Sequence, residues 1–146
     1  FALLGSAAPI TDMHFMLQKE VVDRMAAGPG SKAYGRLGIM LGCHLSIESL
    51  FNVDRSAFDP PPEITSAVVQ LDPLPPGTFD IQDDVLLSKI VTSAFMKRRK
   101  TIRNSLKDIA EIADLEAVDI DSGLRPEQIS ILKYVELSNH LAGRLS

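Results

Sequence analysis

The period of the hydrophobic pattern changes at a proline-rich stretch near the middle of the chain. The stretch covers residues 73–77 and holds three prolines followed by Gly77. Before it, apolar residues alternate as in strands; after it they recur at helical spacing, as at Leu86, Ile90 and Ala94. Proline suits neither a helix interior nor a central strand, so the stretch is expected to be a linker. We predict an α/β part over residues 1–75 followed by an all-α, helical part over residues 76–146.

The first part shows strand and helix patterns in alternation. Strands are predicted over 13–17, 43–53 and 64–71, and helices over 19–27 and after Ser31. Alternation in the second strand places Cys43, Leu45 and Phe51 on its inward face. Three strands alone would leave an exposed edge and little core. The pattern therefore indicates that further strands precede Phe1 in a longer protein.

Three helices are predicted in the second part. They cover residues 83–96, residues 97–109, and a segment from Pro126 past His140. The middle helix is expected to turn Ile102, Leu106 and Ile109 inward and Arg99, Arg103 and Lys107 outward. The apolar stripe of the last helix is expected to include Leu132.

Charge is distributed unevenly along the chain. The 146 residues carry 15 basic and 19 acidic side chains, a net charge of −4 that argues against general binding of polyanions. Residues 97–107 nevertheless hold six basic residues and no acidic one: Lys97, Arg98, Arg99, Lys100, Arg103 and Lys107. Residues 108–121 then hold six acids and no base. This pattern predicts local recognition of phosphate; the alternative is a solvated helix face neutralised by the acids that follow.

The residues by themselves show no catalytic apparatus. No G-x-G-x-x-G motif follows a predicted strand, and the Gly-Pro-Gly turn at 28–30 follows a helix. Cys43, the single cysteine, has no metal-ligand spacing to any of the three histidines. One inward cysteine suits a reducing compartment, the cytoplasm, and no apolar run reaches the roughly 18 residues of a membrane span. No metal and no membrane are therefore expected as partners.

Four blocks of sequence together resemble one enzyme family. They are residues 13–22 (MHFMLQKEVV), 31–37 (SKAYGRL), 58–69 (FDPPPEITSAVV) and 95–106 (FMKRRKTIRNSL). Their order and spacing resemble the bacterial small-subunit ribosomal RNA adenine dimethyltransferases, over essentially the whole chain. The proline-rich block and the Arg-Arg-Lys-Thr block are specific in combination.

The resemblance implies a fold, a reaction and a cofactor. Members of that family are Rossmann-like methyltransferases with a small C-terminal helical domain. They use S-adenosylmethionine to dimethylate N6 of two adjacent adenines near the 3′ end of small-subunit RNA. The family's glycine-rich cofactor loop, ribose-binding acid and Asn-Leu-Pro-Tyr motif lie upstream of the position that matches Phe1. The chain thus resembles the C-terminal half only, and alone it is expected to hold no cofactor and to be inactive.

The resemblance also implies site residues and partners. Phe58 matches the position that stacks on the flipped target adenine; the alternative is a core residue that anchors the proline loop. The small ribosomal subunit and its RNA are the implied partners. The six basic side chains of residues 97–107 are expected to bind the phosphates of that RNA. Arg125 and Arg24 are further candidates for RNA binding, with an ordinary surface role as the alternative.

Two other functions stay open at this point. One is a non-catalytic RNA-binding or ribosome-assembly module that works through the basic block. The other is an adenine methyltransferase of large-subunit RNA, although the SKAYGR and RRKT blocks favour the small subunit. Binding of S-adenosylmethionine distinguishes an enzyme from a module that only binds RNA.

Overall fold

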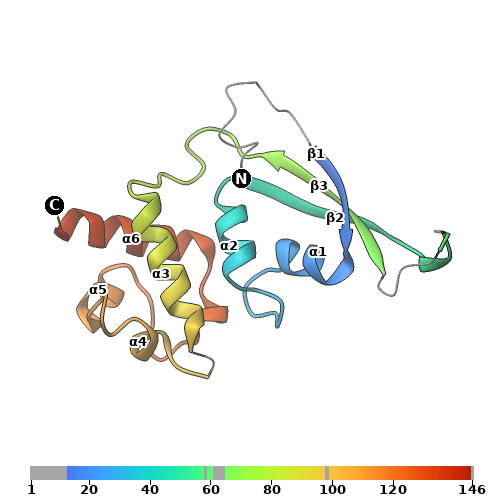
Figure 1. The fold of residues 1–146 in the computed structure, drawn as a ribbon. Coiled ribbons are helices and arrows are strands. Elements are labelled where there is room, and N and C mark those ends of the chain that lie inside the picture. Colours follow the sequence, from blue (N-terminus) through green and yellow to red (C-terminus); the bar gives the residue numbers. More distant parts are fainter. Residues whose placement is uncertain (1–12, 58, 61–64, 98, 146) are drawn as a thin grey trace.

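The computed structural model describes residues 13–57, 59–60, 65–97 and 99–145 of the chain. A three-stranded sheet and α1 (Lys19–Ala26) lie at one side of the molecule and a group of helices at the other, with α2 (Arg36–Gly42) between them (Figure 1). Phe58 and Arg98, two of the predicted site residues, lie outside the described residues. The elements are, in order, β1 (Met13–Gln18), α1 (Lys19–Ala26), α2 (Arg36–Gly42), β2 (Leu45–Val53), the 3-10 helix η1 (Arg55–Ala57), β3 (Ser66–Pro73), α3 (Asp84–Met96), α4 (Ile102–Ser105), α5 (Ile112–Ala117), the 3-10 helix η2 (Pro126–Gln128) and α6 (Ile131–Leu145).

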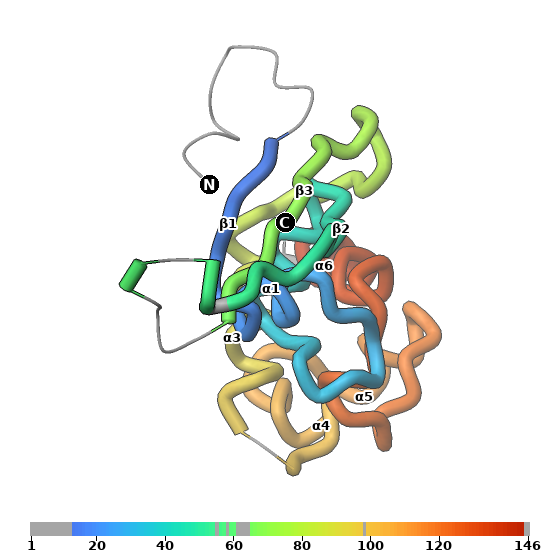
Figure 2. Tube along the Cα trace, turned by 90° about the vertical axis from the view of Figure 1, so that its right-hand side faces the viewer, coloured from blue at the N-terminus to red at the C-terminus, as the bar shows by residue number. Residues whose placement is uncertain are grey.

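The sheet has the order β1-β3-β2, with β3 antiparallel to both neighbours (Figure 2). In the register, Val69 of β3 lies opposite Phe15 on one side and Ser49 on the other. Alternate residues of β3 face the core, where they are buried against α1 and α2. This smaller cluster consists of Val22, Met25, Leu41, Leu45, Ala67, Val69 and Leu71. The sheet therefore packs against one side of α1 and α2.

A β-bulge in β2 overturns one expectation about the inward face of that strand. The register shifts between Ser49 and Phe51, so that Phe51 lies opposite Val68 instead of continuing the inward series. Side chains alternate with a period of two, and one extra residue moves the next side chain to the opposite face. Phe51 is accordingly 58% exposed, and its predicted inward position is wrong. Cys43, by contrast, is buried as expected.

The larger hydrophobic cluster joins α3 and α6 to the segments around them. Leu87, Ile90 and Val91 of α3 are completely buried in it. It also takes in Tyr34, together with Ile39 of α2 and Cys43 just after it, all of which precede the proline-rich stretch. Helix α2 therefore packs on both clusters, and the division of the chain near residue 75 stays a prediction.

The continuous helix predicted over residues 97–109 is wrong. After Met96 the backbone leaves the helix, and α4 comprises only four residues, with Thr101 as its N-cap. Unbalanced positive charges at helical spacing destabilise a helix, whereas a threonine cap favours a new start. The predicted faces are nevertheless right, because Ile102 and Leu106 are buried while Arg103 and Lys107 are exposed.

The last third of the chain differs from the predicted elements in two further ways. Helix α5 was not predicted, because its six residues are too short to show a clear period. The helix expected from Pro126 is two elements, η2 and α6, separated by the extended residue Ile129. This changes the phase of the stripe, so Leu132 is 49% exposed rather than in the core. No helix among the described residues has the length and apolar character needed to cross a membrane.

Candidate nucleic-acid interface

A cavity of about 670 Å³ opens where three segments distant in sequence meet. They are the loop between α1 and α2, the C-terminal end of α3, and η2 with the residue before it (Figure 1). Among the residues that the structure describes, five basic side chains and a single acid line the cavity, which we call the basic groove: Lys32, Arg36, Lys97, Arg99 and Arg125, with Glu127. All five basic residues are exposed, so their charges face solvent in the groove.

None of these five cations forms an ion pair within the described part of the chain. Elsewhere, exposed cations do find carboxylates: Lys19 lies 2.7 Å from Asp23. Arg24 likewise lies 2.7 Å from Glu20. Unpaired like charges around one concave surface create a focused positive potential, which attracts an anion. The groove is therefore a candidate site for phosphate groups.

Two buried tyrosines hold the floor of the basic groove in place. The Tyr34 hydroxyl donates to the Ile129 carbonyl at 2.8 Å, and the Tyr134 hydroxyl donates to the Pro126 carbonyl at 2.7 Å. The Phe95 ring lies between them, with centroid distances of 6.4 and 6.3 Å. Burial raises the pKa of both tyrosines above its ordinary value, so both hydroxyls stay protonated donors. These bonds fix η2, which carries the Arg125 side of the groove.

The wall formed by the end of α3 depends on an unusual backbone conformation. Arg99 has a φ of 68°, in the left-handed region that L-residues with a Cβ avoid. This conformation costs roughly 1–2 kcal/mol for such a residue. The turn keeps Lys97 and Arg99 on the same groove after the helix has ended.

The structure brings together three of the predicted RNA-binding residues, namely Lys97, Arg99 and Arg125. Lys100, Arg103 and Lys107 are exposed but do not line the groove. Arg24 also lies outside it, paired with Glu20 on α1. For each of these residues a role in RNA binding stays a prediction.

Sequence reasoning missed Lys32 and Arg36 as members of the groove. They belong to the SKAYGRL block, but no run of charge surrounds them, and the other cations of the groove lie more than 60 residues further along the chain. Only the packing of the α1–α2 loop against η2 brings them to the site. The Gly30 amide makes that contact by donating to the Glu127 carbonyl at 2.7 Å.

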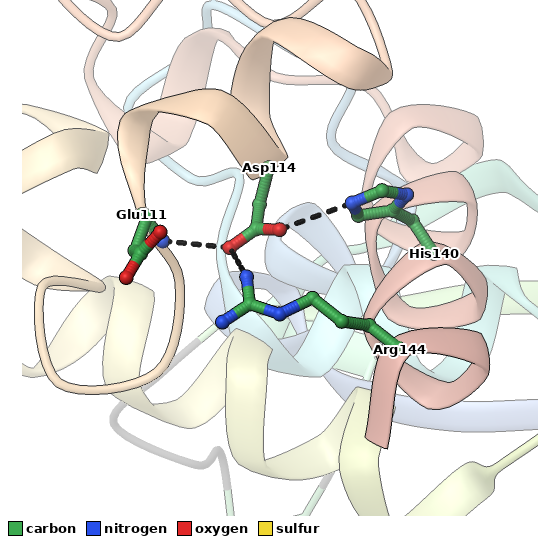
Figure 3. A network of polar contacts seen from close by, with 4 residues as sticks. All are labelled: Glu111, Asp114, His140 and Arg144. Atoms are coloured by element: carbon green, nitrogen blue, oxygen red, sulfur yellow. Dashed lines mark hydrogen bonds and ion pairs between the residues drawn. The ribbon is translucent and has the colours of Figure 1, made fainter. Parts of the chain in front are cut away.

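A separate polar network joins α5 to α6 (Figure 3). The Asp114 side chain is 3% exposed and accepts hydrogen bonds from the Glu111 amide at 2.8 Å and from the Arg144 guanidinium. His140 Nε2 lies 3.0 Å from its other oxygen. Burial raises the pKa of Asp114, but these hydrogen bonds outweigh it and hold the pKa below its ordinary value. None of these residues lines the basic groove, and the network links two helices.

The described residues hold no group of three or more His, Cys, Asp or Glu side chains placed to bind a metal ion. His140 is engaged with Asp114, and Cys43 is buried. Burial, followed by the charge of Asp84, raises the pKa of the Cys43 thiol to about 11, so it is protonated at neutral pH.

Comparisons with known proteins place the chain in one family. A family model described as ribosomal RNA adenine dimethylase matches residues 1–143. The Ribosomal RNA small subunit methyltransferase A of Pseudomonas putida is 50% identical over 142 residues, which are 97% of this chain and 53% of that protein. The protein of the same name from Chromobacterium violaceum is 49% identical over 141 residues, or 97% of this chain and 54% of its own length. The chain thus spans about half the length of the curated relatives it matches.

Two solved structures have a similar fold. A dimethyladenosine transferase from Plasmodium falciparum superposes with a TM-score of 0.74 at 22% identity, over 92% of this chain and 59% of that one. The 23S rRNA methyltransferase ErmE superposes with a TM-score of 0.64 at 19% identity, over 95% of this chain and 57% of that one. At these identities the likeness concerns the fold alone.

Proposed function

Because the chain belongs to the ribosomal RNA adenine dimethylase family, we propose that it is the RNA-gripping part of an enzyme that dimethylates two adjacent adenines of small-subunit ribosomal RNA. The relatives named above support the small subunit, since they carry it in their names. Within this proposal, residues 1–75 are the C-terminal portion of a Rossmann-like methyltransferase domain, and residues 76–146 are a helical RNA-binding domain.

One observation carries the proposal: a single groove is lined by five cations, from three separate segments, that form no ion pair with any residue the structure describes. In this proposal Lys97, Arg99 and Arg125 bind phosphates of the ribosomal RNA and orient the enzyme on the subunit. Lys100, Arg103 and Lys107, with Arg98 of the same basic block, are proposed to bind further phosphates, and Arg24 to add a contact from α1. Phosphate contacts position a protein on RNA without reading its sequence.

Phe58 is proposed to stack on the target adenine. A base must leave its helix before its N6 can be methylated, and an aromatic face offsets part of that cost. Stacking of this kind contributes about 1–3 kcal/mol per base. The prolines at positions 60–62 flank Phe58 and would limit the entropy that the loop loses on binding.

S-adenosylmethionine, the cofactor implied by the resemblance, does not fit the described residues. Its sulfonium carries a positive charge, whereas the basic groove holds five cations and one carboxylate. Strand β1 also passes directly into α1 without the glycine turn that cradles such cofactors. The proposal therefore assigns RNA contacts to these residues and no part of the methyl transfer itself.

The proposal predicts that binding to unmethylated small ribosomal subunits depends on the groove. The double variant Arg99→Ala/Arg125→Ala should weaken binding about tenfold and lower the slope of log K against log salt by about 1 to 2, because two phosphate contacts are lost. Affinity is measured by fluorescence anisotropy across a salt titration. Lys89→Ala on the exposed part of α3 is the control and should bind as the unaltered chain does. Unchanged affinity and slope in the double variant would contradict the proposal.

A second candidate is a module that binds ribosomal RNA without catalysis. It is supported by the same groove, because binding of RNA phosphates needs no residue that takes part in methyl transfer. Clear binding of S-adenosylmethionine to the chain in a calorimetric titration would contradict this candidate, since a module that only binds RNA needs no cofactor, whereas absence of binding is what both candidates predict for this half of the relatives' length. Methylation of large-subunit RNA is less favoured, because the likeness to ErmE concerns the fold alone.

A further inference from the structure

We propose that Lys32 and Arg36 form a second wall of the phosphate site, so that a single RNA strand lies across the basic groove with its phosphates held from both sides. The opposite wall consists of Lys97, Arg99 and Arg125. This inference rests on the proposed function and deepens it, because it adds two residues and specifies one strand as the ligand.

The wall that carries Lys32 and Arg36 has a defined backbone. Ser31 turns the loop by hydrogen-bonding the Gly28 carbonyl through both its amide, at 3.3 Å, and its hydroxyl, at 3.0 Å. The Tyr34 amide then donates to the Ser31 carbonyl at 3.3 Å, and the Tyr34 ring is buried beneath the groove. Lys32 and Arg36 therefore project from a segment held at both ends, which reduces the entropy lost when they bind.

The two walls are also fixed relative to each other. The Gly30 amide donates to the Glu127 carbonyl of η2, and the Tyr34 hydroxyl donates to the Ile129 carbonyl just after η2. Each bond joins residues almost 100 positions apart. A groove with walls set before binding favours a ligand whose charges are spaced along a chain, as phosphates are along RNA.

Charge and size together point to one strand rather than a duplex. The five cations of the groove repel one another, and one acid, Glu127, lies among them. Anions that enter the groove relieve this repulsion. The cavity of about 670 Å³ has the size of a small-ligand site, which suits a short stretch of one backbone better than the two backbones of a duplex. Positively charged grooves that follow one backbone are the usual way in which proteins hold single-stranded nucleic acid.

The inference has a consequence for how the enzyme is oriented on its RNA. One wall belongs to the α1–α2 loop and the first residue of α2, and the other to the segments around α3 and η2. A strand bound to both would fix the sheet-bearing part and the helical part on the RNA simultaneously. Lys32 and Arg36 would then act as positioning residues, without contact with the reacting atoms.

The first test uses the 146-residue chain and a labelled single-stranded RNA of 12 nucleotides. We expect Lys32→Ala/Arg36→Ala to weaken binding about tenfold and to lower the salt slope by about 1.4, from about 0.7 for each phosphate contact with a single strand. The control Lys19→Ala/Lys89→Ala removes two positive charges outside the groove and should retain the affinity and slope of the unaltered chain. Circular dichroism shows whether each variant keeps its fold.

The second test follows backbone amides by NMR during titration of the same RNA into the unaltered chain. Amides of residues 30–36 and of residues 97, 99 and 127 should shift with one common dissociation constant. Shifts confined to the α3 and η2 side would overturn the two-walled site, as would full affinity of the Lys32→Ala/Arg36→Ala variant. Either result is compatible with the proposed function, which fails instead when Arg99→Ala/Arg125→Ala binds small subunits as well as the unaltered chain does.

Discussion

Asp114 shows how a single buried charge is stabilised in this molecule. Its carboxylate is almost completely removed from solvent, yet it accepts hydrogen bonds from an amide, a guanidinium and an imidazole that belong to α6 and the start of α5. A buried ion that keeps such partners remains charged, whereas loss of one partner leaves the others unsatisfied. The α5–α6 contact is therefore sensitive to the protonation state of one residue.

This residue gives a prediction about pH. The pKa of Asp114 is lowered in the folded state, so its contribution to stability is complete at neutral pH and is lost as the pH falls through the folded pKa, below 3.8. Asp114→Asn should lower the free energy of unfolding by about 2 kcal/mol at pH 7. The difference from the unaltered chain should shrink toward pH 3, as measured by urea unfolding. Asp108→Asn, at an exposed position, is the control, and a cost independent of pH would contradict the assignment.

Helices α1 and α2 pack so closely that one position tolerates no side chain. A Cβ on Gly38 would come within 2.7 Å of the Arg24 backbone carbonyl in α1. Gly42, one turn further along α2, would meet only the terminal methyl of Ile131, at 2.5 Å. A backbone must move as a unit, whereas the end of an isoleucine side chain rotates away. The two glycines of α2 therefore differ in the neighbour that an added side chain would meet: the backbone at Gly38 and a movable side chain at Gly42.

This contrast predicts that the same substitution changes the free energy of unfolding by different amounts at the two glycines. Gly→Ala in a helix ordinarily gains up to about 1 kcal/mol from helix propensity. Gly38→Ala should nevertheless destabilise the chain by about 2 kcal/mol, because α1 and α2 must separate. Gly42→Ala should change stability by less than about 1 kcal/mol in either direction. Urea unfolding of both variants measures the difference, and equal effects would contradict the close contact of Gly38 with the Arg24 carbonyl.

The elements also show what sequence patterns could and could not predict. Periodicity was sufficient for β1, α1 and α3, whose bounds agree with expectation to within about two residues. It failed where a local event interrupted the period, at the bulge before Phe51 and at the break after Met96. The groove was partly predictable: Lys97 and Arg99 were marked by the basic block and Arg125 by its place before the last predicted helix, but Lys32 and Arg36 reach the site only through tertiary packing.

At the scale of the whole molecule, α2 connects the two hydrophobic clusters. Leu41 faces the sheet cluster, while Ile39 and the adjoining Cys43 belong to the larger helical cluster. Tyr34 adds a third buried side chain to the helical cluster from the same region. The helical part thus takes some of its core from residues that precede the proline-rich stretch.

A shortened chain tests this dependence. Residues 76–146 alone lack Tyr34, Ile39 and Cys43, and removal of one large buried side chain typically costs 2–5 kcal/mol. Small domains have only about 5–15 kcal/mol of stability in total. We expect the piece to lose cooperative thermal unfolding and to bind a hydrophobic dye, unlike the complete 146-residue chain. A sharp thermal transition with well-dispersed amide resonances would show instead that the helical part is self-sufficient.

The pair of tyrosines beneath the basic groove also has a spectroscopic consequence. The sequence contains two tyrosines and no tryptophan, so the intrinsic ultraviolet emission of the protein comes from Tyr34 and Tyr134. Both rings are buried, both hydroxyls are hydrogen-bonded, and Phe95 lies between them. The unlabelled protein therefore carries its own optical reporter at the base of the proposed RNA site, with no tryptophan emission to obscure it.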